Sequence, residues 1–209
     1  MEDKCTPSHL PLARRFCLNA KGLPYKTIWV EFPDIEASLA IARYLERTYP
    51  GPVALIPPAL DGLVGDFQKA VWAAFGLPMM RLVVPAVHAT LRPGARPYFR
   101  ATREARFGQP LEELAPAGSA LRAECWRRRG SGGGARGVRT LLVSDALPVS
   151  YADAIMVSWL YWFRECLGEE SGEWKTMTAW HGGRWVRLMA AMEKYAQVDS
   201  GESVQLSKL

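Results

Sequence analysis

The sequence has little of what metal sites, secreted disulfide scaffolds and membrane spans require. It contains four cysteines and three histidines in 209 residues. The cysteines lie far apart, with no Cys-x-x-Cys pair and no partnered histidines, a spacing that argues against a zinc site and a disulfide framework. No run approaches the roughly 20 apolar residues of a membrane helix, and residues 1–15 lack the apolar core of a secretory signal. We therefore expect an intracellular protein with reduced thiols, no metal and no membrane partner.

The composition is that of an ordinary globular protein. Apolar residues make up 49% and charged residues 22%, and the eight tryptophans can supply much of a core.

The net charge of +5 is mild, and much of the excess lies in the arginine-rich residues 122–139. Nucleic-acid binding through that stretch is one hypothesis, and it would weaken steeply with salt. Because only Trp126 interleaves the arginines and glycines space them, we expect a disordered segment and no nucleic-acid partner.

The first 50 residues predict a small α/β fragment. A helix is expected over residues 14–22, ending at Gly22. Residues 24–32 alternate in polarity and are rich in β-branched and aromatic side chains, which predicts a strand. Ser38 can cap a helix over residues 39–49, because a serine hydroxyl accepts the free N–H groups of a first turn. Residues 51–60 are rich in proline and predict a linker.

Residues 61–198 predict an all-α domain. Pro78 and Pro85 are expected to bend or interrupt its first helices, and Gly182-Gly183 to interrupt its last. Residues 130–137 are rich in glycine, with five in eight positions, and predict a flexible insert, while the polar residues 199–209 predict a flexible tail. The expected helices cover residues 61–77, 79–91, 97–107, 111–113 onward, 119–128, 148–167 and 173–198.

One motif has a direct physical explanation, the pair Ser150-x-x-Asp153. The Ser150 hydroxyl can accept the Asp153 N–H while the Asp153 carboxylate reaches back to the Ser150 N–H, which is a capping box. The box opens the almost wholly apolar segment 154–163, whose helix start would have no water to satisfy its N–H groups. We interpret both residues as structural. Core packing is the expected role of the aromatics at 159–163, and His88 and His181 are expected to be structural.

Five stretches, residues 16–27, 29–35, 38–50, 97–104 and 173–185, carry a family resemblance. They resemble the fungal etherase-type (FuA) glutathione transferases, which are related to bacterial lignin β-etherases. Residues 16–27 and 29–35 resemble the first helix and second strand of that class, and residues 38–50 resemble the helix that closes its glutathione domain. Residues 97–104 and 173–185 resemble C-terminal signatures. The resemblance implies an α+β fold, mainly α, in which an incomplete thioredoxin-like domain (1–50) precedes an all-α bundle.

The resemblance also implies glutathione as co-substrate and assigns candidate residues to it. In the family, an acidic residue and a serine at a helix N-terminus hold the γ-glutamyl end of glutathione, where free N–H groups suit a carboxylate. Ser38 matches that serine, but Ala37 stands in the acidic position and Glu36 lies one residue earlier; a plain N-cap remains the alternative. Ser8 falls near the place of the thiol-activating serine, with a surface serine in a frayed terminus as the alternative. Cys17 is a weaker candidate.

The chain departs from the family at sharp boundaries. Only two residues separate Ile35 from Ser38, where the family has a strand, a short helix and a hairpin, about 35 residues on ordinary element lengths. The first strand and the cis-proline loop are also missing, so the strand at 24–32 is expected to lack sheet neighbours. A mis-joined or alternatively spliced product would explain these boundaries, and evolved remodelling is the alternative.

Two functions follow from the resemblance. The first is conjugation of glutathione to electrophilic or aromatic compounds, or glutathione-dependent ether cleavage, by the intact form of the protein. We expect this activity to be impaired in the present chain. The alternative is a non-catalytic binder of apolar aromatic ligands. The resemblance further implies a homodimer and small apolar or aromatic substrates. The terminal Ser207-Lys208-Leu209 matches a peroxisomal import signal, and a cytoplasmic location is the alternative.

Overall fold

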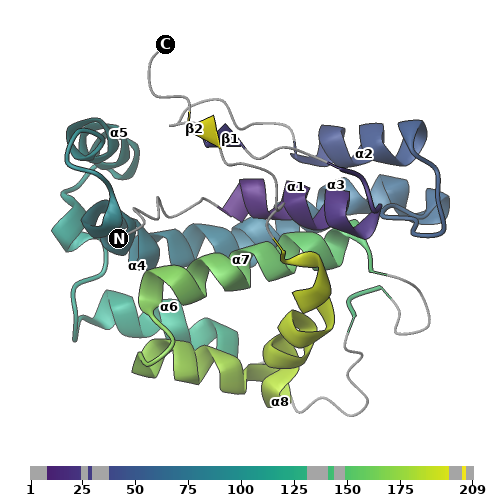
Figure 1. Ribbon diagram of the computed structural model, residues 1–209. Coiled ribbons are helices and arrows are strands. Elements are labelled where there is room, and N and C mark those ends of the chain that lie inside the picture. The colour runs from purple at the N-terminus through teal and green to yellow at the C-terminus, as the bar shows by residue number, and fades with distance from the viewer. Residues whose placement is uncertain are drawn as a thin grey trace. The chain divides into compact units, whose positions relative to one another are not determined.

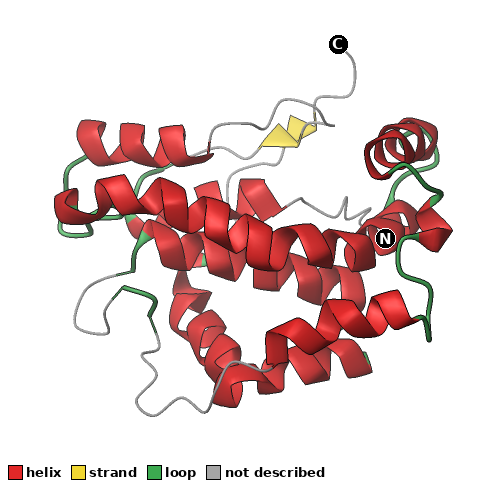
Figure 2. Ribbon diagram, turned by 180° about the vertical axis from the view of Figure 1, so that it is seen from behind, coloured by secondary structure: helices red, strands yellow, loops and turns green. Residues whose placement is uncertain are grey.

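The computed structural model describes residues 9–24, 28–29, 38–130, 141–143, 149–197 and 204–205. Helices make up most of this part of the chain, as Figure 2 shows in red. By their contacts the described residues divide into two compact units. The first unit comprises residues 69–130 and 159–186, and the second comprises residues 9–68, 141–143, 149–158, 187–197 and 204–205.

The second unit is built around two short helices, α1 (His9–Ala20) and α2 (Ser38–Thr48), which pack against each other (Figure 1). Their buried faces contain Ala13, Phe16, Cys17 and Ala20 on α1 and Ala42 and Leu45 on α2. The helix α1 begins earlier than the expected residue 14. Its third residue, Pro11, is compatible with this start because the N–H groups of a first helical turn have no partner within the helix.

The 3₁₀ turn η1 (Pro58–Leu60) leads into α3 (Asp61–Val71), a π-helical turn η2 (Trp72–Gly76) and α4 (Leu77–Thr90). The helices on either side of Leu77 are bent by 67°, which agrees with the bend expected at Pro78. The helix α4 continues through Pro85. Within the described residues no single helix combines the length and hydropathy of a membrane span, and only the bent pair Pro58–Gly76 and Pro78–Thr90 satisfies both when taken together.

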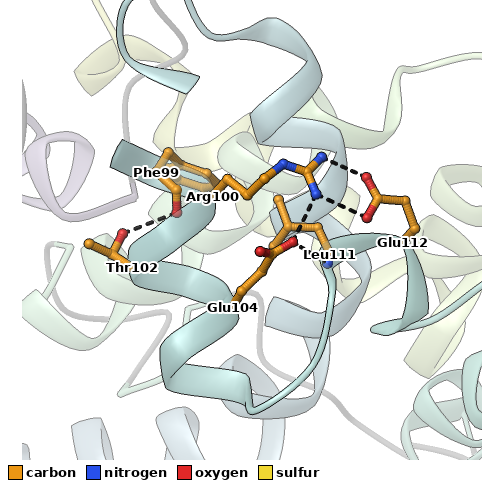
Figure 3. Close-up of polar contacts among 6 residues, drawn as sticks. All are labelled: Phe99, Arg100, Thr102, Glu104, Leu111 and Glu112. Atoms are coloured by element: carbon orange, nitrogen blue, oxygen red, sulfur yellow. Dashed lines mark hydrogen bonds and ion pairs between the residues drawn. The ribbon is translucent and has the colours of Figure 1, made fainter. Parts of the chain in front are cut away.

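The helix α5 (Arg96–Phe107) is joined to the following 3₁₀ turn η3 (Leu111–Glu113) by a charged cluster in the first unit. Figure 3 shows the Arg100 guanidinium between the carboxylates of Glu104 and Glu112. Its Nη2 lies 2.6 Å from Glu112 Oε1 and its Nη1 2.8 Å from Glu104 Oε1. Glu104 Oε1 also accepts the N–H of Leu111 at 3.2 Å. The cluster therefore holds the chain where it leaves α5.

The remaining helices are α6 (Ala120–Gly130), α7 (Tyr151–Leu167) and α8 (Gly172–Met192), followed by the 3₁₀ turn η4 (Glu193–Tyr195). In the first unit α6 and α8 are joined by a bidentate pair, in which Arg122 Nε and Nη2 lie 2.6 and 2.8 Å from the two Glu173 oxygens. The helix α8 is interrupted as expected. His181, Gly182 and Gly183 all have left-handed dihedral angles, which glycine adopts without a steric penalty.

The strand expected at residues 24–32 is described only at β1 (Ile28–Trp29). Its expected lack of sheet neighbours is wrong at these two residues. The strand β1 pairs in parallel with β2 (Val204–Gln205) from the C-terminal tail, in a two-stranded sheet within the second unit. The insert at 130–137 lies outside the described residues except for Gly130, which is the last residue of α6.

Candidate functional site

The helix α2 begins at Ser38, the residue that the sequence indicates as a helix start and a candidate ligand of glutathione. A helix N-terminus presents unpaired N–H groups and a partial positive charge, which suit a carboxylate ligand. The Ser38 side chain, Glu36 and Ser8 lie outside the described residues. The structure therefore provides the helix terminus at the expected position, while the roles of the three residues stay predictions.

The opposite end of α2 is fixed by a partly buried ion pair that the sequence does not signal. Lys21 Nζ lies 3.0 Å from Glu46 Oε2, and the Lys21 side chain is 2% exposed. The same Glu46 oxygen accepts the N–H of Leu55 at 2.8 Å, and the carbonyl of Leu55 accepts the N–H of Tyr151 at 2.7 Å. The helix α2 is thus tied to the end of α1, to the proline-rich linker and to the start of α7. None of these partners is adjacent in sequence, so no local pattern could reveal them.

The second unit buries a thiol and a phenol close to this linkage. Cys17 is 1% exposed, and burial, followed by the nearby Glu46 carboxylate, raises the pKa of its thiol to about 12. Tyr151 is also 1% exposed, burial raises the pKa of its hydroxyl, and that hydroxyl donates to Gln68 Oε1 at 3.2 Å. Both groups therefore stay protonated at neutral pH. Since the thiolate is the nucleophilic form, Cys17 is a packing residue, as its place on a buried helix face indicates.

The aromatic residues of α7 lie in the core of the first unit. Trp159, Trp162 and Phe163 are 3%, 5% and 0% exposed. Their rings contact one another with centroids 5.5–5.7 Å apart, and Phe163 also meets Phe75 of η2 edge-on at 5.2 Å. This burial confirms the expected packing role, because close-packed rings leave no open surface for a ligand.

The start of α7 contains both hydrogen bonds of the capping box. The Ser150 N–H donates to Asp153 Oδ2 at 2.8 Å, and the Asp153 N–H donates to the Ser150 hydroxyl at 3.4 Å. The Ser150 hydroxyl also donates to Asp153 Oδ2 at 2.6 Å. The Leu142 N–H donates to the second carboxylate oxygen, Asp153 Oδ1, at 2.7 Å. Asp153 is 0% exposed, so its carboxylate is fully engaged in holding backbone groups.

The two described histidines that the sequence singles out lie against aromatic rings. The His88 ring is 6.3 Å from that of Phe99, and the His181 ring is 5.5 Å from that of Trp185. Partial burial lowers the pKa of His88, with smaller contributions from Arg100 and Arg96. Among the residues that the structure describes, no three His, Cys, Asp or Glu side chains gather closely enough to hold a metal ion.

The helical part of the chain matches a protein family. The model of the glutathione S-transferase C-terminal domain matches residues 63–195. The chain belongs to the glutathione S-transferase family. This places α3 to α8 in the all-α C-terminal domain of the family and confirms the mainly α fold class, with the N-terminal domain incomplete.

Solved structures of fungal glutathione S-transferases resemble this chain. A glutathione S-transferase of Ceriporiopsis subvermispora, solved in complex with glutathione, is 34% identical, with a TM-score of 0.84 over 96% of this chain and 95% of that chain. The glutathione transferase GSTFuA3 of Phanerochaete chrysosporium is 31% identical, with a TM-score of 0.77 over 92% of each chain. The glutathione S-transferase-like protein ustS of Aspergillus flavus is 25% identical over 248 residues, covering 87% of this chain and 86% of its own. The resemblance to the FuA class is confirmed.

Proposed function

We propose that this glutathione S-transferase binds glutathione and transfers it to small electrophilic or aromatic compounds, with activity reduced by its incomplete N-terminal domain. The observation that carries the proposal is its likeness to a transferase solved with glutathione, at 34% identity over 96% of this chain. In that proposal the γ-glutamyl carboxylate lies at the N-terminus of α2, beside Ser38. The Lys21–Glu46 pair holds the other end of α2 to the end of α1 and to the linker.

The proposed reaction needs only the glutathione thiol and an electrophile. The thiol loses its proton to solvent, and a nearby hydroxyl or N–H stabilises the thiolate that remains. Ser8 is the proposed donor of that hydrogen bond. The thiolate sulfur then forms a bond to an electrophilic carbon, and the leaving group, such as chloride, departs with the bonding electron pair. Ether cleavage follows the same sequence with an alkoxide or phenoxide as the leaving group.

The test is turnover of a chromogenic chloronitrobenzene with glutathione by the folded full chain. We expect turnover above the uncatalysed rate, a raised KM for glutathione in Ser38→Ala, and a lowered kcat in Ser8→Ala. Ser119→Ala is the matched control, because Ser119 caps a different helix by accepting the Arg122 N–H at 3.1 Å. Absence of turnover in folded protein would contradict the proposal. Binding of a fluorescent aromatic ligand that persists without glutathione would then favour a non-catalytic binder.

Peroxisomal import through Ser207-Lys208-Leu209 and a homodimer remain proposals from the sequence and the family resemblance. Import is tested by fluorescence microscopy of the full chain carrying an N-terminal fluorescent protein, with and without these three residues. The oligomeric state is tested by analytical ultracentrifugation.

A further inference from the structure

The C-terminal tail forms a strand on the N-terminal part of the chain. Ile28 pairs with Val204 and Trp29 with Gln205, in parallel, and Figure 1 shows β1 and β2 side by side in the second unit. These strands are separated by more than 170 residues of sequence, so the pair is purely a product of the tertiary fold. In the part of the chain that the structure describes, this is the only sheet.

A second attachment holds the tail independently of the strand pair. The turn η4, just before the tail, packs against α1. The Asn19 side-chain amide on α1 donates to the carbonyls of Tyr195 and Gln197, with Nδ2 to oxygen distances of 2.7 and 2.9 Å. These carbonyls lie at the end of η4 and just beyond it, so the Asn19 amide fixes the chain on α1 at this point. The tail therefore leaves α8 already anchored on α1, a short distance along the chain before β2.

The strand β1 lies in a segment whose sequence favours pairing with another strand. Residues 24–32 combine β-branched and aromatic side chains in alternation, and an exposed edge of such a strand is a template for pairing with another chain. Proteins blunt such edges by pairing or covering them. In this chain the strand that pairs with β1 comes from the tail.

We propose that β2 is an intramolecular protective strand: it occupies one of the two backbone edges of β1, on which a strand of a second copy of this chain would otherwise pair. The partner that this edge fits is an extended backbone segment, taken by main-chain hydrogen bonds as in β-strand addition. A strand of two residues binds weakly by itself. Its covalent connection to η4, which the Asn19 hydrogen bonds hold on α1, raises its effective concentration at β1 above that of a strand from a second copy.

The test replaces both residues of β2 in the full chain. The double variant Val204→Pro/Gln205→Pro removes the two N–H groups of β2, because proline has none. Asp199→Pro/Ser200→Pro is the matched control, with the same two prolines in the tail before β2. We expect the β2 variant to self-associate at least about tenfold more tightly than the wild type in analytical ultracentrifugation, since a tethered competitor has been removed. The control is expected to sediment like the wild type.

Adding a separate peptide of residues 200–209 tests whether the extra assemblies form by pairing at β1 or through another surface. It is expected to dissociate the extra assemblies of the β2 variant, and it should leave a dimer formed through any other surface unchanged. Hydrogen exchange at Ile28 and Trp29 is expected to accelerate in the monomeric variant, while circular dichroism stays that of the wild type. Unchanged sedimentation together with unchanged exchange at these two amides would overturn the proposal, as would self-association on which the peptide has no effect. Because none of these readouts involves glutathione, failure here is distinguishable from failure of the proposed transferase function.

Discussion

Asp153 accepts more hydrogen bonds than a residue that only caps a helix, and it does so in the protein interior. Its two oxygens accept the N–H groups of Leu142 and Ser150 and the Ser150 hydroxyl, and its side chain is fully buried. An unpaired buried donor costs the full penalty of removing it from water. The carboxylate therefore stabilises the start of α7 and the approach of residues 141–143 together.

We predict that Asp153→Ala lowers the free energy of unfolding by about 2–4 kcal/mol, because the buried Ser150 N–H and the partly buried Leu142 N–H lose their acceptor and a helix loses its cap. Ser119→Ala is the comparison: its cap on α6 is half-exposed, so water can replace the hydroxyl and the loss should be about 0.5–1 kcal/mol. Urea denaturation followed by circular dichroism measures both. Equal losses in the two variants would contradict the role of burial.

The contribution of Glu112 to stability is expected to depend on pH. Hydrogen bonds from Arg100 lower the pKa of its carboxyl to about 2, below the ordinary value of 4.5. A carboxyl whose pKa is lowered by folding stabilises the protein above its unfolded pKa, and this contribution is lost as pH falls through the folded pKa. Its effect is small, because the side chain is 66% exposed and salt screens the pair.

We predict that Glu112→Gln is less stable than the wild type at neutral pH and that the difference disappears between pH 4.5 and 2. The reason is that the wild-type carboxylate becomes protonated in this range, whereas the amide of the variant does not titrate. Thermal melts at several pH values and low ionic strength measure the difference. A difference that stays constant down to pH 2 would show that the substitution perturbs packing rather than charge.

At the scale of elements, the π-helical turn η2 shows how a helix is fitted to its neighbour. Gly76, its last residue, lies where an added Cβ would be 2.7 Å from Trp72 Cε3 and 3.1 Å from Trp159 Cζ2. The rings of Trp72 and Trp159 are themselves 5.8 Å apart. The glycine is therefore required first by the Trp72 ring of its own turn and then by the close approach of Trp159 on α7.

We predict that Gly76→Ala destabilises the protein by about 1–3 kcal/mol, the usual cost of overpacking a core. Gly65→Ala is the matched control in the adjoining helix α3, because its added Cβ would lie 3.7 Å from Leu39 Cδ2, an ordinary contact. There alanine should be neutral or stabilise by up to about 1 kcal/mol through its higher helix propensity. Chemical denaturation of both variants measures the contrast, and a stabilised Gly76→Ala would refute the steric explanation.

The whole molecule combines the helical C-terminal domain of the family with an incomplete N-terminal domain. The family domain extends over residues 63–195, whereas the N-terminal part of the second unit relies on distant partners: the linker, the start of α7 and the tail. A ligand that binds only the folded state stabilises it in proportion to the logarithm of its concentration. Glutathione binding at α2 would therefore be visible as stability of the entire chain.

We predict that glutathione raises the melting temperature progressively, with a gain in the free energy of unfolding of about 2.7 kcal/mol at a hundred times its Kd. Differential scanning fluorimetry over a glutathione titration measures the shift. Ser38→Ala is expected to need more glutathione for the same shift, while Ser119→Ala is expected to follow the wild type. A melting temperature that is independent of glutathione would rule out the proposed site at α2.

The sequence alone determined the features that depend on neighbouring residues. Proline, glycine and apolar periodicity indicated the linker, the bend at Pro78, the interruption at Gly182-Gly183 and the apolar helix opened by Ser150 and Asp153, because each is a local preference of the backbone. The family could be read from contiguous stretches for the same reason. Only the tertiary structure decided that Lys21 pairs with Glu46, that the Leu142 N–H donates to Asp153 and that β2 pairs with β1. These contacts join residues far apart in the chain, and which of them meet depends on how the helices pack.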